Sequence, residues 1–212
     1  MDAHPLRTSI GDLIAGLRSI EAGIITKARV LEYLAEMDLG YEALSRYVFW
    51  DASSYTRNLI FRDELFEVLA LCWLPGQKTP VHTHNGQLGW MKVVQGEILL
   101  REYRHLRCSA PENRHVVGMD CLAGGRGVEL QLLKTDRCGA DGRVTTVDKT
   151  QTIHQIENAE TSGAGCVSLH IYSKPIDSCV AFDLAQGCCV RRSLRNYSAD
   201  GRILSPITSE VT

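Results

Sequence analysis

Two histidines in the segment PVHTHNGQLGWMKVVQGE constrain this chain more than any other feature. His82 and His84 are two positions apart, and on a β-strand such side chains point to the same face of the sheet. Glycines flank them at regular intervals, at positions 76, 89 and 96. The segment therefore predicts a sheet that offers two imidazoles to one metal ion.

A third histidine occurs far downstream, in the segment HQIEN, where His154 is followed four residues later by Asn158. Together with the glycine spacing, these segments resemble the two sequence motifs of the cupin superfamily. The resemblance implies a double-stranded β-helix, a small β-barrel, in which His82, His84 and His154 bind a metal ion. Cupin sites usually add a glutamate, and Gly89 stands at that position here.

Three imidazoles without a carboxylate leave coordination positions open on a bound ion. By ligand type alone, such a set suits divalent iron, zinc, nickel or copper. Because no ligand neutralises the ion, the site favours anionic ligands, including a thiolate. A bound metal also lowers the pKa of a thiol enough to deprotonate it.

The chain divides into a helical part and a strand-rich part. Residues 8–47 predict helices, the first capped by Ser9, the second ending near Gly40 and a short third one over 41–47. Short apolar runs after residue 50 predict the following strands: Phe66–Trp73, Gly89–Val94, Glu97–Tyr103, Val128–Leu133, Thr145–Val147, Thr152–Gln155, Cys166–Tyr172, Cys179–Asp183 and Cys188–Arg192.

The connections between these strands are also predicted. Gln95-Gly96 predicts a tight hairpin turn, and residues 105–115 and 134–143 are polar and predict loops. We expect an all-β fold with a helical N-terminal segment (1–48) packed on a cupin barrel (49–196). A weakly ordered C-terminal tail (197–212) follows.

Composition excludes several classes of protein. The chain has 212 residues and a net charge of -2, which argues against nucleic acid or an anionic membrane surface as a partner. It begins without a hydrophobic signal core, and its eight cysteines lack zinc-finger spacing. We therefore expect a cytoplasmic monomer whose cysteines are reduced and mostly buried.

Three polar side chains alternate in the segment SLHIY. Ser168, His170 and Tyr172 share one face of the predicted strand, where a strand facing a core normally carries apolar residues. Each has a donor and an acceptor, so together they can form a hydrogen-bonded chain. The alternative is a buried polar network that only stiffens the barrel.

These segments resemble the thiol dioxygenase family of the cupin superfamily, and most closely its cysteine dioxygenases. The matching pieces are YTRN (55–58), HTH (82–84), HQIEN (154–158), SLHIYS (168–173) and DSCVAFD (177–183). The resemblance implies an enzyme of cysteine catabolism that uses Fe(2+). It would add both atoms of O2 to the sulfur of L-cysteine and form cysteine sulfinate.

The resemblance also implies roles for individual residues. His82, His84 and His154 would hold the iron, and Arg57 would bind the substrate carboxylate with help from Tyr55. Tyr172 would direct its hydroxyl toward the reacting centre, held and polarised by Ser168 and His170. Cys179 matches a family cysteine near the substrate pocket. Without the resemblance, the sequence favours an ordinary surface ion pair of Arg57 with Asp51 or Asp63.

Two positions depart from the family pattern. Animal members carry a cysteine at position 89 that becomes linked to the active-site tyrosine, so Gly89 predicts an unmodified Tyr172. Animal members also have Ser-Pro-Pro after the tyrosine. Here the segment is Ser173-Lys174-Pro175, so the family's cis bond is not expected at Ser173–Lys174.

Other functions stay open from the sequence. A close one is a dioxygenase of 3-mercaptopropionate or another small thiol carboxylate, such as mercaptosuccinate or homocysteine. Relatives that prefer 3-mercaptopropionate usually have glutamine at the position of Arg57, which favours cysteine here. A cupin of another class would bind metal as a sensor without catalysis, or act as a zinc or nickel isomerase. Residues 8–47 lack a basic recognition helix, and Gly89 removes the usual isomerase glutamate.

Overall fold

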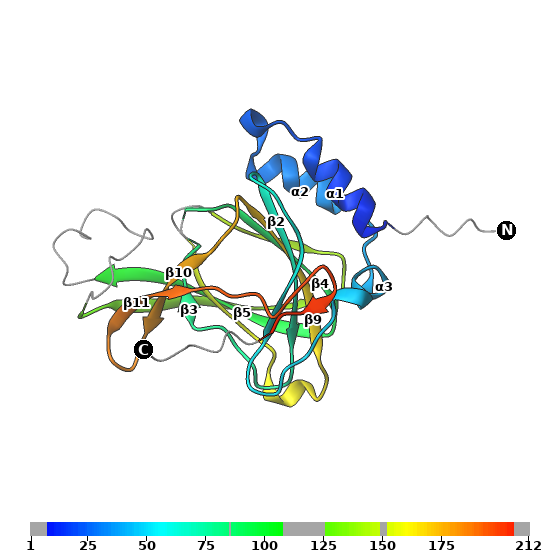
Figure 1. The fold of residues 1–212 in the computed structure, drawn as a ribbon. Coiled ribbons are helices and arrows are strands. Elements are labelled where there is room, and N and C mark those ends of the chain that lie inside the picture. Colours follow the sequence, from blue (N-terminus) through cyan, green and yellow to red (C-terminus); the bar gives the residue numbers. More distant parts are fainter. Residues whose placement is uncertain (1–7, 85, 108–125, 149–151, 206–212) are drawn as a thin grey trace, which may run out of the picture.

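The computed structural model describes residues 8–84, 86–107, 126–148 and 152–205. Two antiparallel sheets face each other and form a β-barrel, with helices along its outside (Figure 1). The seven-stranded sheet has the order β13-β12-β1-β2-β9-β4-β7, and the six-stranded sheet has the order β11-β10-β3-β8-β5-β6. β12 runs parallel to β1, and the other paired strands are antiparallel.

The strand bounds follow the apolar runs of the sequence. In the seven-stranded sheet they are β1 Thr56–Arg62, β2 Phe66–Trp73, β4 Gly89–Gln95, β7 Val144–Val147, β9 Cys166–Ser173, β12 Ser198–Ala199 and β13 Arg202–Ile203. In the six-stranded sheet they are β3 Val81–His82, β5 Glu97–Arg107, β6 Glu129–Gly139, β8 Ile153–Glu157, β10 Ser178–Asp183 and β11 Cys188–Ser193.

The order of the strands identifies the fold. Eight consecutive strands, β2 to β9, are divided between the two sheets as β2-β9-β4-β7 and β3-β8-β5-β6, and every step along the chain changes sheet except that from β5 to β6, which pair with each other. This is the arrangement of a jelly roll, the architecture of the cupin double-stranded β-helix. The predicted all-β cupin barrel is therefore confirmed.

The helices cover the outer face of the seven-stranded sheet. They are α1 Ile10–Arg18, α2 Lys27–Ala35 and α3 Tyr41–Leu44, with short 3-10 turns at Ala22–Ile24, Ser45–Tyr47 and Glu160–Ser162. Ser9 caps α1 as predicted, in a capping box with Asp12. Apolar residues of α1 and α2 pack against alternate residues of β2 and β9, including Val68 and Leu169. The other face of these strands is free to line the barrel interior.

Both faces of β2 and β9 are therefore buried, one by helices and one by the barrel. Polar side chains also tie the two layers together. Lys92 of β4 donates to the Met37 carbonyl at 2.7 Å, and the Trp90 indole donates to the Lys27 carbonyl at 3.0 Å. The helices thus fix the outer face of the sheet whose inner face carries polar residues.

The connections differ from the predictions in three places. Gln95-Gly96 does turn the chain, with Gly96 at φ +75, but β4 and β5 enter different sheets and form no hairpin. Strand β6 runs to Gly139, so the loop predicted over 134–143 is wrong for its first part. β5 likewise reaches Arg107, and residues 108–115 lie outside the described part. Most of β6 is exposed, which explains its weak apolar pattern.

Within the predicted tail, Ser198–Ala199 and Arg202–Ile203 form strands, and residues 206–212 lie outside the described part. β12 pairs with β1, and the buried Ser198 hydroxyl donates to Asn58 Oδ1 at 2.8 Å. β1 itself was not predicted as a strand. Of the cysteines, those at positions 72, 138, 166, 179 and 189 are buried and Cys188 is partly exposed, while Cys108 and Cys121 lie outside the described residues.

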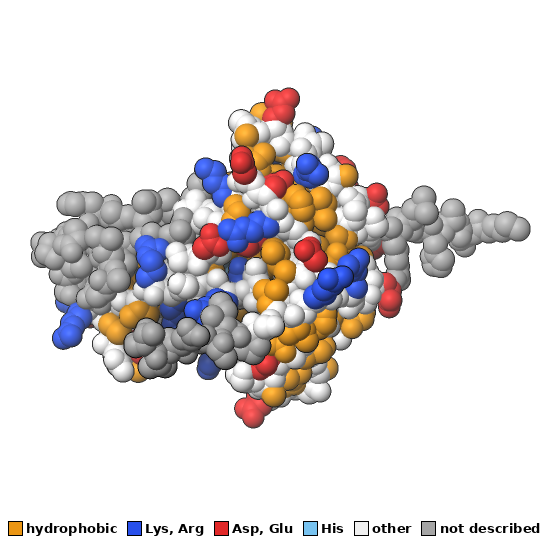
Figure 2. Space-filling model, viewed as in Figure 1, with side chains coloured by type: hydrophobic (Ala, Val, Ile, Leu, Met, Phe, Trp, Pro, Cys, Tyr) orange, Lys and Arg blue, Asp and Glu red, His pale blue; other side chains and the backbone are white. Residues whose placement is uncertain are grey.

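Surface features agree with the composition. Figure 2 shows Lys, Arg, Asp and Glu side chains interspersed on one face of the molecule. Across the described residues, the helices are too short or too polar to span a bilayer.

Candidate metal and substrate site

Two neighbouring strands bring the three histidines together. His82 on β3 lies directly opposite His154 on β8, and His84 follows β3 two residues later. The centroids of the three imidazole rings lie 4.5, 4.7 and 5.1 Å apart. One ring nitrogen of each can be chosen so that all three lie within 4.8 Å of one another. The three side chains thus form a group able to bind a metal ion.

The electrostatics of the histidines fit a cation. Burial lowers the pKa of His82 to about 4 and holds the pKa values of His84 and His154 well below the ordinary value, so all three are neutral. His82 Nδ1 lies 3.0 Å from the Pro80 carbonyl, to which it can donate, and this leaves Nε2 for a ligand. Within the described residues, His84 Nδ1 and both ring nitrogens of His154 are buried without a hydrogen-bond partner. Neutral, unpartnered and converging imidazoles suit a divalent transition metal.

Asn158 supports this group without joining it. Its side chain is fully buried, and its amide donates to the carbonyls of Trp73 and Ala164 at 2.9 Å each. The hydrogen bonds of Asn158, the last residue of the segment HQIEN, therefore hold the chain after β8 in place, and with it His154.

The hydrogen-bonded chain expected from SLHIY is present on the inner face of β9. Ser168 Oγ lies 2.9 Å from His170 Nε2, and the Tyr172 hydroxyl lies 3.3 Å from His170 Nδ1. Trp73 Nε1 extends the chain by donating to Ser168 Oγ at 2.9 Å. The Ser168 hydroxyl has no other acceptor among the described residues, and in the tautomer in which it donates to His170 Nε2 the imidazole proton sits on Nδ1.

When His170 Nδ1–H donates to the Tyr172 oxygen, the phenol proton is not used within this hydrogen-bonded chain. His170 Nδ1–H points to the phenol oxygen, so the phenol can donate its own proton elsewhere. Burial raises the pKa of Tyr172 to about 12 and lowers the pKa of His170 to about 3. Both groups therefore stay neutral, and Tyr172 is a hydrogen-bond donor at the cavity.

Gly89 lies beside the Tyr172 ring. The two residues are directly opposite on β4 and β9, and a Cβ at position 89 would lie 3.2 Å from two ring carbons. It would also lie 2.6 Å from Val147 Cγ2. Glycine brings no sulfur to this position. In the turn after the tyrosine, the Ser173–Lys174 peptide is trans and Lys174 has a left-handed φ of 69.

Arg57 is buried, and its partner differs from those expected. Its Nη2 lies 3.5 Å from Glu67 Oε2, and both side chains are at least nine-tenths buried. Asp51 instead accepts from Ser53, and Asp63 accepts from the backbone of residues 65 and 66. Within the described residues, Arg57 Nε is buried without a partner. The guanidinium therefore keeps a free donor in addition to its ion pair.

Three groups contact the Glu67 carboxylate: Arg57, Arg62 and the Ile176 backbone N–H. Arg62 Nη1 lies 3.4 Å from Glu67 Oε1, and the Ile176 backbone N–H donates to Oε2 at 3.3 Å. Burial raises the pKa of Glu67, while the nearby Arg57 counteracts that rise. Arg62 in turn forms a bidentate ion pair with Asp177, with nitrogen–oxygen distances of 2.8 and 2.9 Å.

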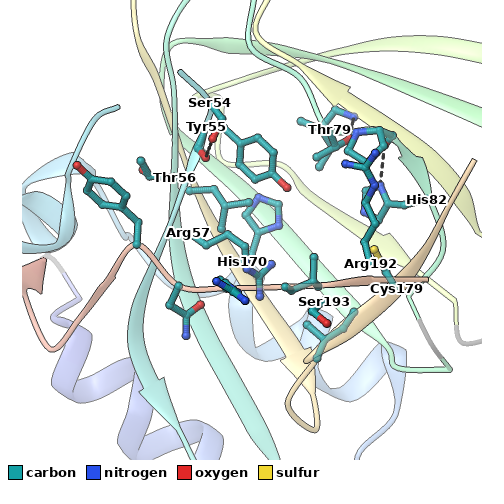
Figure 3. A pocket seen from close by; sticks show the side chains of 18 of the residues that line it. Ser54, Tyr55, Thr56, Arg57, Thr79, His82, His170, Cys179, Arg192 and Ser193 are labelled. Atoms are coloured by element: carbon teal, nitrogen blue, oxygen red, sulfur yellow. Dashed lines mark hydrogen bonds between the residues drawn. The ribbon is translucent and has the colours of Figure 1, made fainter. Parts of the chain in front are cut away.

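One cavity unites most of the predicted site residues (Figure 3). It has a volume of about 480 Å³, and its walls include Tyr55, Arg57, His82, His84, His170, Tyr172 and Cys179. The Tyr55 ring stacks on Trp73, with centroids 4.5 Å apart. Ser168 is buried one hydrogen bond behind His170, and His154 joins the histidine group from β8.

The sequence reasoning missed Glu67, Trp73 and three cations of the cavity wall, Lys78, Arg192 and Arg195. A signal for Glu67 existed. It is a single acid in FEVLALCW, a strand that is otherwise apolar and entirely buried, and buried carboxylates are normally paired.

Known proteins are similar to this chain in sequence. The family model of cysteine dioxygenase type I matches residues 6–185, most of the chain. This protein belongs to the cysteine dioxygenase type I family. Human cysteine dioxygenase type 1 is 28% identical over 184 residues, covering 84% of this chain and 81% of the human protein. The rat enzyme is 25% identical over 206 residues, covering 95% and 92%.

A solved structure gives a more distant match. It is a Klebsiella pneumoniae protein with a double-stranded β-helix domain, 15% identical, with a TM-score of 0.38 over 62% of this chain and 86% of that one. The segment matched by the family model contains every site residue predicted from the sequence, from Tyr55 to Cys179.

Proposed function

We propose that this protein is an iron(II)-dependent thiol dioxygenase that oxidises L-cysteine with O2 to cysteine sulfinate. The observation that carries the proposal is a single cavity with neutral histidines at one place and a buried arginine with a free donor at another. The reaction, R–SH + O2 → R–SO2H, is balanced. The sulfur loses four electrons, O2 accepts them, and both oxygen atoms remain on the sulfur.

The histidines are the proposed iron ligands. When bound, ferrous iron supplies open coordination positions for a thiolate and the redox chemistry that O2 requires. The three neutral imidazoles leave the charge of the ion uncompensated, which favours an anionic sulfur ligand. Family membership and the donor set support this choice of metal.

Arg57 is the proposed carboxylate-binding residue. A guanidinium presents several donors in a plane that matches a carboxylate. Glu67 engages Nη2, and Nε remains free, so a substrate carboxylate can be bound while the ion pair persists. Tyr55 is the neighbouring wall residue and is fixed by its stacking on Trp73. Arg57 and Tyr55 together determine the direction in which the bound substrate extends from its carboxylate to its sulfur.

Tyr172 is the proposed hydrogen-bond donor to the reacting centre. Its ring stacks near His84, with centroids 6.1 Å apart, so the phenol lies beside the histidine group. Ser168 and His170 act as positioning residues, because with the imidazole proton on Nδ1 their hydrogen bonds make the phenol oxygen an acceptor and leave its proton for the reacting centre. A passive metal-binding cupin has no use for this arrangement.

Oxygen consumption by the iron(II)-loaded protein tests the proposal, with L-cysteine and 3-mercaptopropionate run side by side. We expect faster uptake with cysteine and one sulfinate formed per O2 consumed. A preference for 3-mercaptopropionate would keep the chemistry and overturn the substrate. No uptake with either thiol, in protein that retains iron, would favour a non-catalytic cupin. His154→Ala serves as the control, because it should lose iron and activity together.

A further inference from the structure

The outer part of the cavity carries positive charge that the proposed chemistry does not use. Lys78, Arg192 and Arg195 line it together with the inner Arg57, whereas none of its described lining residues is an aspartate or glutamate. Cavities lined by charges of one sign concentrate ligands of the opposite sign. The surplus of cations therefore predicts an anionic ligand group.

Two of these cations lack a protein partner. Several arginines pair with carboxylates, as Arg62 does with Asp177 and Arg137 does with Glu97. The side chains of Arg192 and Arg195 form neither an ion pair nor a hydrogen bond with any described residue. Arginines that line a cavity without a partner are available to a ligand.

The strand register places Arg192 within reach of the histidine group. Ala181 of β10 pairs with both His82 of β3 and Val190 of β11, and Cys179 pairs with Arg192. Arg192 thus lies two strands across and two residues along from His82. With about 4.8 Å between strands and about 3.4 Å per residue, the two Cα atoms are about 12 Å apart. An extended arginine side chain covers much of that distance, and Figure 3 places Arg192 beside Cys179 and His82.

Arg192 and Arg57 approach the cavity from different walls. Both arginines act on Tyr55: burial raises the pKa of its phenol, and the charges of Arg57 and Arg192 counteract that rise. Glu67 already compensates part of the Arg57 charge, but no described carboxylate compensates Arg192. A ligand with one carboxylate, bound at Arg57, would leave the outer guanidiniums unmatched.

The size of the cavity also exceeds the proposed substrate. Its 480 Å³ equals the volume of about 16 liquid waters, more than a three-carbon amino acid fills. Arg192 and Arg195 also lie beyond residues 6–185, the segment that the family model matches.

We propose that Arg192, with Arg195 and Lys78, forms a second anion subsite, and that this site accepts thiols with two carboxylates. One carboxylate is held at Arg57 and the other at Arg192, with the sulfur at the histidine group. The inference rests on the proposed thiol dioxygenase activity for its substrate, but the anion subsite can be measured without turnover. Mercaptosuccinate is the simplest thiol of this class.

A binding experiment tests the subsite alone. Succinate and butyrate are titrated into the metal-free protein by calorimetry, because they differ in one carboxylate and neither has a thiol. We expect succinate to bind at least about tenfold more tightly, the effect of one charge-assisted contact. Arg192→Gln, or Arg192→Gln with Arg195→Gln, should remove the difference. Equal binding of both acids to the wild-type protein would overturn the subsite.

Arg191→Gln is the matched control. It removes the neighbouring arginine, whose side chain points to the opposite face of β11 and donates to Ser178 Oγ at 3.2 Å. It removes one positive charge, as Arg192→Gln does, and should keep the preference for succinate. Loss of the preference in this variant would show that overall charge, and no specific site, attracts the dicarboxylate.

A kinetic experiment tests the substrate class. We expect the iron(II)-loaded enzyme to oxidise mercaptosuccinate, and Arg192→Gln to lower its kcat/KM about tenfold relative to that of cysteine. Turnover of cysteine without mercaptosuccinate would refute the inference and leave the proposed activity standing. An equal loss for both thiols, abolished by salt, would show electrostatic steering and also refute it. Turnover of neither thiol would refute the dioxygenase activity, while the succinate titration still decides the subsite.

Discussion

Replacing Arg57 with alanine tests the carboxylate-binding role, but it changes two things at once. It removes the free donor at Nε, and it removes the partner that lies 3.5 Å from Glu67 Oε2. The first loss affects substrate binding, and the second affects the stability of the fold. Their magnitudes can be estimated separately.

The binding loss follows from one charge-assisted contact. Such a hydrogen bond contributes about 1.5–3 kcal/mol, so KM for cysteine should rise about 10–100-fold. The stability loss follows from orphaning a buried carboxylate, which costs about 3–5 kcal/mol when no partner remains. Glu67 keeps Arg62 at 3.4 Å and the Ile176 N–H at 3.3 Å, so we expect the lower end. About 3 kcal/mol lowers Tm by about 6–12 °C in a chain of this size.

The pH dependence of this loss has a definite sign. Burial already raises the Glu67 pKa above its ordinary value of 4.5, and removing Arg57 raises it further. The fold then favours the protonated acid, so stability is kept below the ordinary pKa and is lost as pH rises through the raised one. The Tm deficit of Arg57→Ala relative to the wild-type protein should therefore widen as pH rises above the raised pKa that Glu67 has in the wild-type fold.

A double variant separates the two effects. Arg57→Ala with Glu67→Gln leaves no orphaned carboxylate, so most of the Tm deficit should disappear. KM should stay raised, because the donor to the substrate is still missing. Oxygen uptake over a range of cysteine concentrations, together with thermal melts of the same samples, gives both values. If KM returns to the wild-type value along with Tm, Arg57 supports only the fold and the reasoning is refuted.

Other predictions concern the phenol, the buried thiols and the glycine beside the phenol. Tyr172→Phe should retain iron but lower kcat about tenfold or more, or consume O2 without forming sulfinate, because the proton donor is lost. A normal rate with normal coupling of O2 use to sulfinate would show that the hydrogen bonds of Ser168, His170 and Tyr172 serve stability alone. Burial raises the pKa of Cys72 to about 11 and of Cys166 to about 12, so at pH 8 only about one Cys72 in a thousand is a thiolate. Peptide mapping after iodoacetamide treatment should leave both unlabelled in the native protein, and labelling at the unfolded rate would contradict their burial. Gly89→Ala should cost about 1–3 kcal/mol in urea unfolding, because its Cβ would meet Val147 Cγ2 at 2.6 Å, and Val147→Ala should recover part of that loss.

The parts of the site that could be predicted depend on spacing within one strand. A strand alternates its side chains with a period of two, so Ser168, His170 and Tyr172 had to share a face wherever β9 paired. The distance between His82 and His84 carries the same kind of information. Joining these segments to the distant His154 required the resemblance to a known family, because a single sequence does not show which strands are neighbours.

The parts that could not be predicted depend on pairing between strands. The turn at Gly96 is visible in the sequence, but whether the chain returns along the same sheet depends on distant strands. Likewise, β1 is an edge of the barrel sheet until β12 returns from the end of the chain to pair with it. Arg192 gains its place only because β11 pairs with β10, which in turn pairs with β3.

The register of the seven-stranded sheet also explains why a buried acid near the site leaves the histidines neutral. Glu67, Tyr172 and Gly89 lie in one line across β2, β9 and β4, all on the inner face. The Glu67 carboxylate is drawn away from the histidines by Arg57, Arg62 and the backbone of residue 176. A metal ion bound by the three neutral histidines would keep its full positive charge, and Arg57 is held in place with one donor free. In the proposed function, a substrate thiolate and carboxylate would supply the two negative charges that match them, whereas an acid at position 89 would supply one permanently and crowd Tyr172.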